Sequence, residues 1–221
     1  MNGVIGILKA HQEGDLVKLD REVFTDVSLP KQQIVDVLQG LAIQIPGIKT
    51  TFRCEDPENI EEVEFCYPKG IADFLQEQNK NIETSPVYSQ ELSAEGQDRY
   101  NRPRYTATVT TGICFAQDAG FVKCYHNLKE LTYGGTHCDG ALHNIAQRLE
   151  WMLDCKISKE TLLKHLQLVI VTNSEISDWA NSARTGLQSI FIRDLTRDTI
   201  GDDFHYYVKQ NAAFLRILFN K

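Results

Sequence analysis

The segment Gly134-Gly135-Thr136-His137-Cys138-Asp139 combines residue types that could do chemistry at the start of a helix. The first backbone N–H groups of a helix have no partner within it, so a helix start can hold an anion. The same position favours the thiolate form of a cysteine, which would make Cys138 reactive. Thr136 and Asp139, three residues apart, also fit a capping box. The segment is therefore a candidate anion site, a candidate reactive thiol or a structural turn, and we favour the turn.

A complete active site is not evident around this segment. His137, Cys138 and Asp139 cannot line up as nucleophile, base and orienting group, because consecutive residues of a helix point in different directions. The chain has no Cys-x-x-Cys, no histidine pair four apart on one helix, no glycine-rich phosphate loop and no Gly-x-Ser-x-Gly elbow. The acidic run from 55 to 64 lacks the spacing of a calcium loop. We therefore expect no catalytic residue and no metal site in this chain.

The apolar periodicity predicts the elements that position the segment. Strands are expected at 4–10, 16–25, 49–54, 63–67, 105–115, 121–128 and 168–172, with 121–128 as the return strand of 105–115. Helices are expected from a start marked by Ser28 and Pro30 to Pro46, and at 70–80, 136–155, 158–166 and 204–219. Residues 81–104 should be the least ordered, and residues from 187 irregular or weakly helical. Because strands and helices intermix without a boundary, we predict one α+β domain.

Composition excludes several classes of protein. The 221 residues are 42% hydrophobic, enough for a real core. The formal net charge of −7 argues against a general nucleic-acid binder, which would usually be basic. Six widely spaced cysteines indicate reduced thiols in a cytoplasmic protein. No apolar run approaches the roughly 18 residues of a membrane span, so no membrane association is expected.

One short stretch interleaves basic and aromatic residues. It runs from Arg99 to Tyr105 and contains Arg102 and Arg104. Guanidinium groups there could contact phosphates while a ring stacks on a base, so these arginines are candidate DNA contacts. The alternative, which we favour, is a loop that enters an edge strand with its arginines solvated or paired to Asp98.

Several segments resemble, in order, the ATPase subunits of type IIA DNA topoisomerases, namely gyrase B and topoisomerase IV B. Gly134-Gly135-Thr136-His137 resembles the Gly-Gly-Thr-His motif of that family. The other matching segments are Phe24-Thr25-Asp26, the helix end at 38–47, Tyr67-Pro68-Lys69-Gly70-Ile71-Ala72-Asp73-Phe74-Leu75, the helix and strand at 158–172, and 206–221. Together they cover nearly the whole chain.

The resemblance implies a transducer domain over 1–221 with a fold like the second domain of ribosomal protein S5. Residues from about 203 would begin a helix that leaves the domain. In the family this domain relays ATP-driven closure to DNA strand passage, with ATP and Mg bound elsewhere in the subunit. The chain has neither the motifs of the GHKL ATPase domain nor those of the cleavage domain, so we expect no cofactor for the isolated chain.

The family also has a Gln-Thr-Lys loop after the buried strand, whose lysine reaches the terminal phosphate of ATP. The matching position is Ser182-Ala183-Arg184, so the resemblance makes Arg184 the candidate phosphate contact. Arginine differs from lysine in geometry and hydration, which puts nucleotide sensing in question. Two functions follow: the transducer region of a type II topoisomerase, with DNA and other topoisomerase domains or subunits as partners, or a free-standing, non-catalytic protein that binds a topoisomerase subunit or DNA.

Overall fold

The computed structural model describes residues 30–56 and 59–219 of the chain. The strands expected at 4–10 and 16–25, the Phe24-Thr25-Asp26 segment and the Ser28 cap lie outside these residues. The chain divides into two compact units, residues 1–34 and 35–221. The second unit holds every described element except the start of α2.

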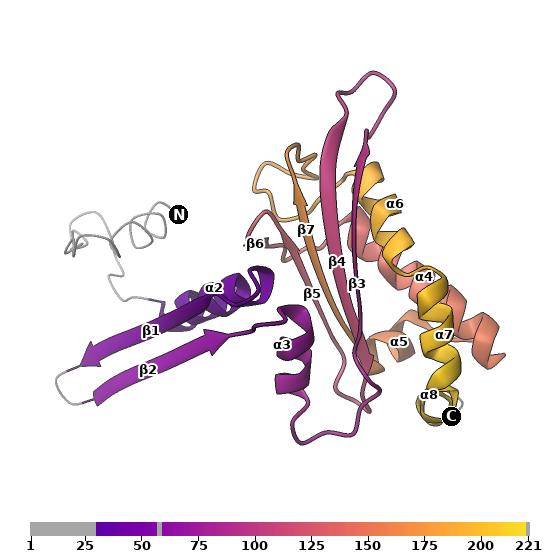
Figure 1. Cartoon of the computed structure of the whole chain (residues 1–221), viewed down its shortest axis with the longest axis horizontal. Helices are drawn as coiled ribbons and strands as arrows, with labels where there is room; N and C mark the ends of the chain where they lie inside the picture. Colours follow the sequence, from indigo (N-terminus) through magenta and orange to yellow (C-terminus); the bar gives the residue numbers. More distant parts are fainter. Residues whose placement is uncertain (1–29, 57–58, 220–221) are drawn as a thin grey trace. The chain divides into compact units, whose positions relative to one another are not determined.

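The described residues form a mixed α+β structure, as predicted (Figure 1). Its helices are α2 (Lys31–Gln44), α3 (Ile71–Gln78), α4 (Thr136–Leu153), α5 (Lys159–His165), α6 (Ile190–Thr199), α7 (Asp202–Gln210) and α8 (Ala212–Phe219). Its strands are β1 (Lys49–Asp56), β2 (Asn59–Cys66), β3 (Tyr88–Gly96), β4 (Tyr105–Phe115), β5 (Phe121–His126), β6 (Lys129–Glu130) and β7 (Leu166–Ser174).

Five of the strands form one sheet in the order β3-β4-β7-β5-β6. β4 is antiparallel to both β3 and β7, and β5 runs parallel to β7. β1 and β2 form a separate antiparallel hairpin, as predicted. The central strand β7 is buried over Leu166–Thr172, which is typical of a strand covered on both faces.

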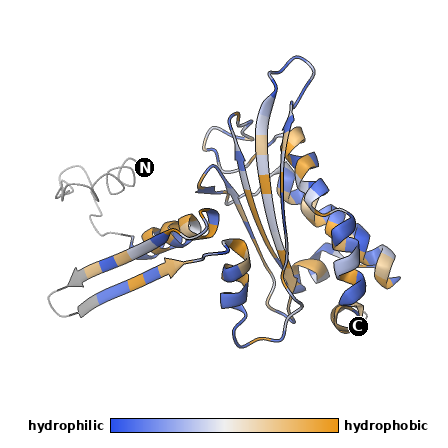
Figure 2. Ribbon diagram, in the orientation of Figure 1, coloured by the Kyte–Doolittle hydropathy of each residue, from blue (hydrophilic) through white to orange (hydrophobic). Residues whose placement is uncertain are grey.

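Two hydrophobic cores cover the two faces of this sheet. Alternate residues of β7 divide between them: Leu168 and Ile170 face one core, whereas Val169 and Val171 face the other. Figure 1 shows α4, α6 and α7 on one side and α2 and α3 on the other. Figure 2 shows the apolar character of β7 between these layers.

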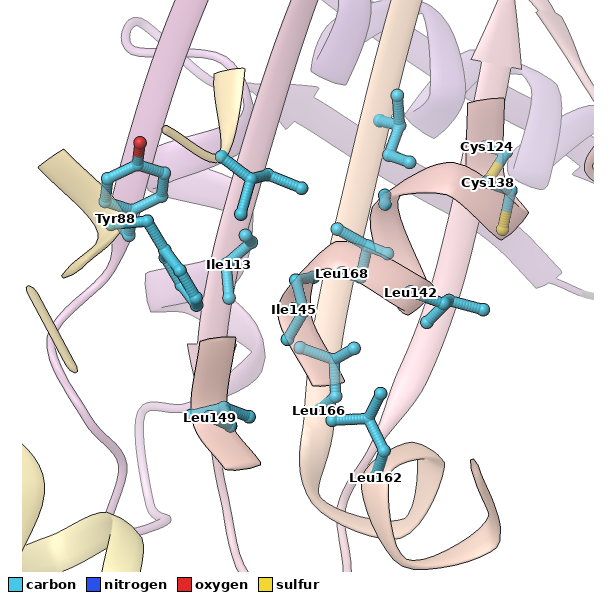
Figure 3. Close-up of a cluster of buried hydrophobic side chains, with 14 of the residues drawn as sticks. Tyr88, Ile113, Cys124, Cys138, Leu142, Ile145, Leu149, Leu162, Leu166 and Leu168 are labelled. Carbon is cyan, nitrogen blue, oxygen red and sulfur yellow. The ribbon is translucent and has the colours of Figure 1, made fainter. Parts of the chain in front are cut away.

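The larger core rests on α4, the helix that starts in the Gly-Gly-Thr-His segment. Its inward side chains include Leu142, Ile145 and Leu149, which face Leu168 and Leu166 of β7 (Figure 3). Burying one such aliphatic side chain contributes roughly 1.5–3 kcal/mol. The start of α4 is therefore fixed in place by the core behind it.

Four expectations were wrong for physical reasons. Residues 81–104 contain the edge strand β3. Its side chains alternate in burial, but its sequence is largely polar and therefore gave no apolar signal. Residues after 187 form the regular helix α6, capped by Ser189. β5 is not paired with β4, because β7 lies between them. The single helix expected at 204–219 is two helices, α7 and α8, which meet at Asn211.

Candidate functional site

The Gly134-Gly135 turn is bound to a loop some fifty residues further along the chain. Both glycines have positive φ, +59° and +136°, a region that favours glycine. The Tyr133 N–H donates to the Thr185 carbonyl at 3.0 Å, and the Leu187 N–H donates to the Gly134 carbonyl at 3.1 Å. The turn and the loop that carries Arg184 therefore form one backbone-paired unit, which we call the turn–loop unit (residues 133–136 and 179–187).

Thr136 stabilises this unit in a different way from the predicted capping box. Gly135 is the N-cap of α4, and no side chain caps the helix there. The Thr136 hydroxyl instead donates to the Ser189 carbonyl at 2.8 Å, and its N–H donates to the Leu187 carbonyl at 2.9 Å. The free N–H groups of the helix start are therefore partly used by the loop, which weakens the anion-site hypothesis.

His137 is a buried neutral side chain. It is 0% exposed, and neither ring nitrogen has a hydrogen-bond partner among the described residues. Burial, with a smaller contribution from His126, lowers its pKa to about 3. Protonation would place an uncompensated charge in the core, so His137 is unsuited to acid–base catalysis near neutral pH.

His126, at the end of β5, links the sheet to the loop that carries Arg184. Its Nδ1 lies 2.8 Å from the Thr172 hydroxyl and its Nε2 lies 2.8 Å from the Ser177 hydroxyl. Its ring packs edge-on against Trp179, with ring centroids 5.2 Å apart. Burial lowers the pKa of His126 to about 4, so it too stays neutral at pH 7.

Cys138 is 8% exposed and lies beside Cys124 of β5 in the larger core. The interaction with Cys124 outweighs burial and lowers the pKa of the Cys138 thiol. No hydrogen bond joins it to His137 among the described residues, so the structure does not form a Cys–His pair.

Arg184 lies at the exposed tip of the turn–loop unit. It has a positive φ of 56°, and its guanidinium carbon lies 5.9 Å from the centre of the Trp179 ring. The Asn181 side chain closes the tip, because its Oδ1 accepts from the Thr185 N–H at 3.1 Å. Lys129 Nζ donates to the Ala183 carbonyl at 3.1 Å, which places a second cation beside the loop.

The three arginines of the β3–β4 loop differ in whether their guanidinium groups are paired within the chain. Arg104 forms an ion pair with Glu95, with Nε and Oε1 2.7 Å apart. Arg99 and Arg102 are exposed and have no side-chain partner among the described residues, and Tyr100 between them is 98% exposed. Asp98 does not pair with these arginines; it accepts from Ser189 instead. Of the two predicted arrangements, solvated arginines are therefore confirmed for Arg99 and Arg102, and pairing to Asp98 is wrong.

A polar cavity of ≈ 570 Å³ between α4 and α6 was not predicted from the sequence. It is lined by Asn144, Arg148, Arg193, Asp194, Arg197, Asp198, Gly201 and Asp202. The three arginines and three aspartates balance, so it carries no net charge that would select an anion. Among the described residues, no group of three His, Cys, Asp or Glu side chains could hold a metal ion, and no helix is long and apolar enough to cross a membrane.

Sequence reasoning did not identify the loop residues that pair with the Gly134-Gly135 turn. Trp179, Thr185 and Leu187 are far from the motif in sequence, and their role rests on main-chain hydrogen bonds that have no side-chain signature. Trp179, a single large aromatic in a polar loop, is the one local signal that could have marked this loop as packed.

No protein-family model matches the chain. It is 21% identical over 203 residues to the B subunit of DNA topoisomerase 4 from Salmonella typhimurium, covering 87% of this chain and 31% of that protein. It is 25% identical over 192 residues to the B subunit of DNA gyrase from Mycoplasmoides gallisepticum, covering 80% of this chain and 29% of that protein. The chain thus spans about a third of the length of these relatives.

A solved structure supports the same assignment at the level of fold. The 43K ATPase domain of Thermus thermophilus gyrase B superposes with a TM-score of 0.60 at 16% identity, covering 91% of this chain and 54% of that one. Likeness at this identity concerns the fold alone. Sequence and fold together show that the chain resembles the B subunits of DNA gyrase and DNA topoisomerase IV.

Proposed function

We propose that the chain is the transducer region of a gyrase B-like type II DNA topoisomerase and relays ATP-driven closure to DNA strand passage. In this proposal residues 1–221 carry no catalytic site, and ATP hydrolysis and DNA cleavage belong to other domains. The fold is then of the ribosomal protein S5 type. The observation that carries the proposal is the backbone pairing of Gly134 and Thr136 with Leu187.

This pairing gives a physical route for a relay. A phosphate that moved Arg184 would pull on a loop whose backbone is hydrogen-bonded to the first residue of α4. Because α4 is packed into the core over its whole length, it can move only as a rigid element. A displacement at the loop tip would therefore reach the far end of α4.

Arg184 suits a single phosphate contact. Its guanidinium is exposed, and the fork of donors matches phosphate oxygens. Lys129, on the same loop surface, adds a second positive charge nearby. The described residues offer no glycine-rich cradle for the rest of a nucleotide, so ATP and Mg would be held mainly by a separate ATPase domain.

The test adds a GHKL ATPase domain of gyrase B to the chain and measures nucleotide affinity and hydrolysis. Removing one charge-assisted phosphate contact costs about 1.5–3 kcal/mol, so Arg184→Ala should weaken nucleotide binding roughly ten- to a hundredfold. Arg102→Ala, which removes another exposed arginine elsewhere on the chain, is the matched control and should bind nucleotide as the wild type does. Equal affinities for both variants would remove Arg184 from the mechanism.

We propose Arg99 and Arg102, with Tyr100, as the DNA contact, and Arg104 as a weaker one because Glu95 already neutralises it. Retention on duplex DNA at low salt should fall several-fold in an Arg99→Ala/Arg102→Ala variant and have a shallower salt dependence. Arg216→Ala, an exposed arginine of α8, is the control. Unchanged retention would exclude this loop.

The same two assays distinguish the alternative function, a free-standing protein that binds DNA or a topoisomerase subunit without catalysis. The exposed Tyr100 between two unpaired arginines is the observation that favours it. DNA retention that depends on Arg99 and Arg102, with no effect of the chain on any added ATPase domain, would support this alternative over the transducer.

A further inference from the structure

Cys124 and Cys138 are two buried cysteines whose side chains lie next to each other in the larger core. The side chain of Cys124, on β5, lies beside that of Cys138, in the first turn of α4, within the same core cluster, and the two thiols interact electrostatically. Figure 3 shows both side chains at the edge of the larger core. A Cβ built on Gly134 would lie 3.5 Å from the Cys138 sulfur, so this thiol lies directly against the glycine turn.

The other four cysteines are placed differently. Cys54 and Cys66 lie on β1 and β2, where their register partners are Glu61 and Lys49. Cys114 donates to the Gln167 Oε1 at 3.0 Å, and burial raises the pKa of this thiol to about 12. Cys155 lies just beyond the end of α4, and burial, with Glu150 and Asp154, raises the pKa of its thiol.

We propose that Cys124 and Cys138 are a reversible oxidation site, which a peroxide converts into an intramolecular disulfide beside the Gly134–Leu187 pairing. The disulfide would join β5 to the start of α4, under the turn–loop unit. This inference does not depend on the proposed function.

The roles of the two thiols are unequal. Cys138 is at a helix start and is the more exposed of the two, so its thiolate reacts first. Its pKa is lowered by the contact with Cys124, whereas the pKa of Cys124 is raised by the same contact and by burial. Cys124 is therefore the resolving thiol.

The reaction balances with hydrogen peroxide as the two-electron oxidant. The Cys138 sulfur attacks one peroxide oxygen, the O–O bond breaks, one water leaves, and Cys138 becomes a sulfenic acid. The Cys124 sulfur then attacks the Cys138 sulfur, the S–O bond breaks, and a second water leaves with the Cys124 proton. Two thiols have lost two electrons and two protons, and a thiol reductant reverses the step.

The experiment treats the whole chain with hydrogen peroxide, then counts free thiols after denaturation and maps disulfide-linked peptides. We expect a loss of two of the six thiols, a single Cys124–Cys138 linkage and full recovery with dithiothreitol. In Cys124→Ser, Cys138 should remain a sulfenic acid that dimedone labels. In Cys138→Ser, neither linkage nor label at Cys124 should form.

Cys155→Ser is the matched control, because it removes a thiol beyond the opposite end of α4 from Cys138; it should form the disulfide as the wild type does. Oxidation of exposed Cys66 without any Cys124–Cys138 linkage would overturn the proposal. Equal dimedone labelling of Cys138 in the wild type and Cys124→Ser would overturn it as well, because Cys124 would not be resolving the sulfenic acid. If a serine variant does not fold, the peptide map of the wild type decides alone.

Discussion

Gly135 lies against the backbone of Leu187 so closely that no side chain fits between them. A Cβ built on Gly135 would be 2.2 Å from the Leu187 carbonyl oxygen and 2.6 Å from its nitrogen. The two residues form a parallel bridge, and the Thr136 N–H bonds the same carbonyl. The glycine is therefore required both by its φ of +136° and by the space that Leu187 occupies.

Gly135→Ala should lower the free energy of unfolding by about 3 kcal/mol or more. The methyl group would collide with backbone atoms, which cannot rotate away, and the backbone conformation itself is strained for alanine. Chemical denaturation followed by circular dichroism measures the change.

Gly47→Ala separates the two causes. Gly47 also has a positive φ, +81°, but a Cβ there would meet nothing within 4 Å. Its substitution should cost only about 1 kcal/mol, the cost of the left-handed conformation alone. Equal losses for Gly135→Ala and Gly47→Ala would show that contact with Leu187 does not matter.

Stability should fall on mild acidification because of His126 and His137. Their pKa values are lowered in the folded chain to about 4 and about 3, from a usual value of 6.5. Between those values the unfolded chain binds more protons, so unfolding becomes easier as the pH falls below 6.5. At pH 5 the loss should be about 2 kcal/mol for each histidine relative to pH 7.5.

His137→Leu tests this directly, because leucine removes the titrating ring and keeps the site apolar. The variant should lose about 2 kcal/mol less than the wild type between pH 7.5 and pH 5. Ile145→Val, a core change without a titrating group, should cost about 1 kcal/mol at both pH values. The same pH dependence in His137→Leu and the wild type would contradict a neutral, buried His137.

Short sequence patterns were enough to predict the β1–β2 hairpin, α5 and β7. The hairpin at 49–66 follows from two strand-like segments separated by a turn, and α5 follows from Ser158, whose hydroxyl accepts from the Thr161 N–H at 3.0 Å. The apolar run at 168–172 predicted a doubly covered strand, which β7 is. In each case the residues that carry the signal lie within a few positions of one another in the sequence.

Long-range contacts explain what was missed. β3 has a polar sequence because one face is exposed at the edge of the sheet, and only Tyr88 on it is fully buried. The insertion of β7 between β4 and β5 depends on pairings that no local pattern encodes. The same holds for the candidate site. The Gly-Gly-Thr-His motif could be recognised in the sequence, but Leu187, whose backbone packs against Gly135 and excludes a side chain there, could not.

Asp98 should contribute to stability by joining the β3–β4 loop to α6. Its carboxylate accepts from the Ser189 hydroxyl at 2.7 Å, from the Phe191 N–H at 3.0 Å and from the Tyr105 hydroxyl at 2.9 Å. Burial alone would raise the pKa of Asp98, but these hydrogen bonds outweigh burial and lower it.

Asp98→Ala should therefore cost about 1–2 kcal/mol at pH 7, because three donors lose a charged acceptor. The contribution of Asp98 is present at neutral pH and is lost as the pH falls through its lowered pKa, so the variant and the wild type should converge in strong acid. Asp198→Ala, an exposed carboxylate of α6, is the control and should change stability by less than about 0.5 kcal/mol. A loss no larger for Asp98→Ala than for Asp198→Ala would contradict the tie between loop and helix.

Trp179 should hold the Arg184 loop against the glycine turn. Its ring contacts His126 on one side and lies under the Arg184 guanidinium, and its backbone forms a bridge with Leu187. Trp179→Ala removes the two ring contacts, worth about 1–2 kcal/mol together. Hydrogen exchange of the Leu187 amide should then be roughly 5–30 times faster while the sheet amides of β7 stay protected. Trp151→Ala, which removes the 73% exposed tryptophan of α4, should leave this exchange unchanged; equal acceleration in both variants would mean that the loop is held by its backbone alone.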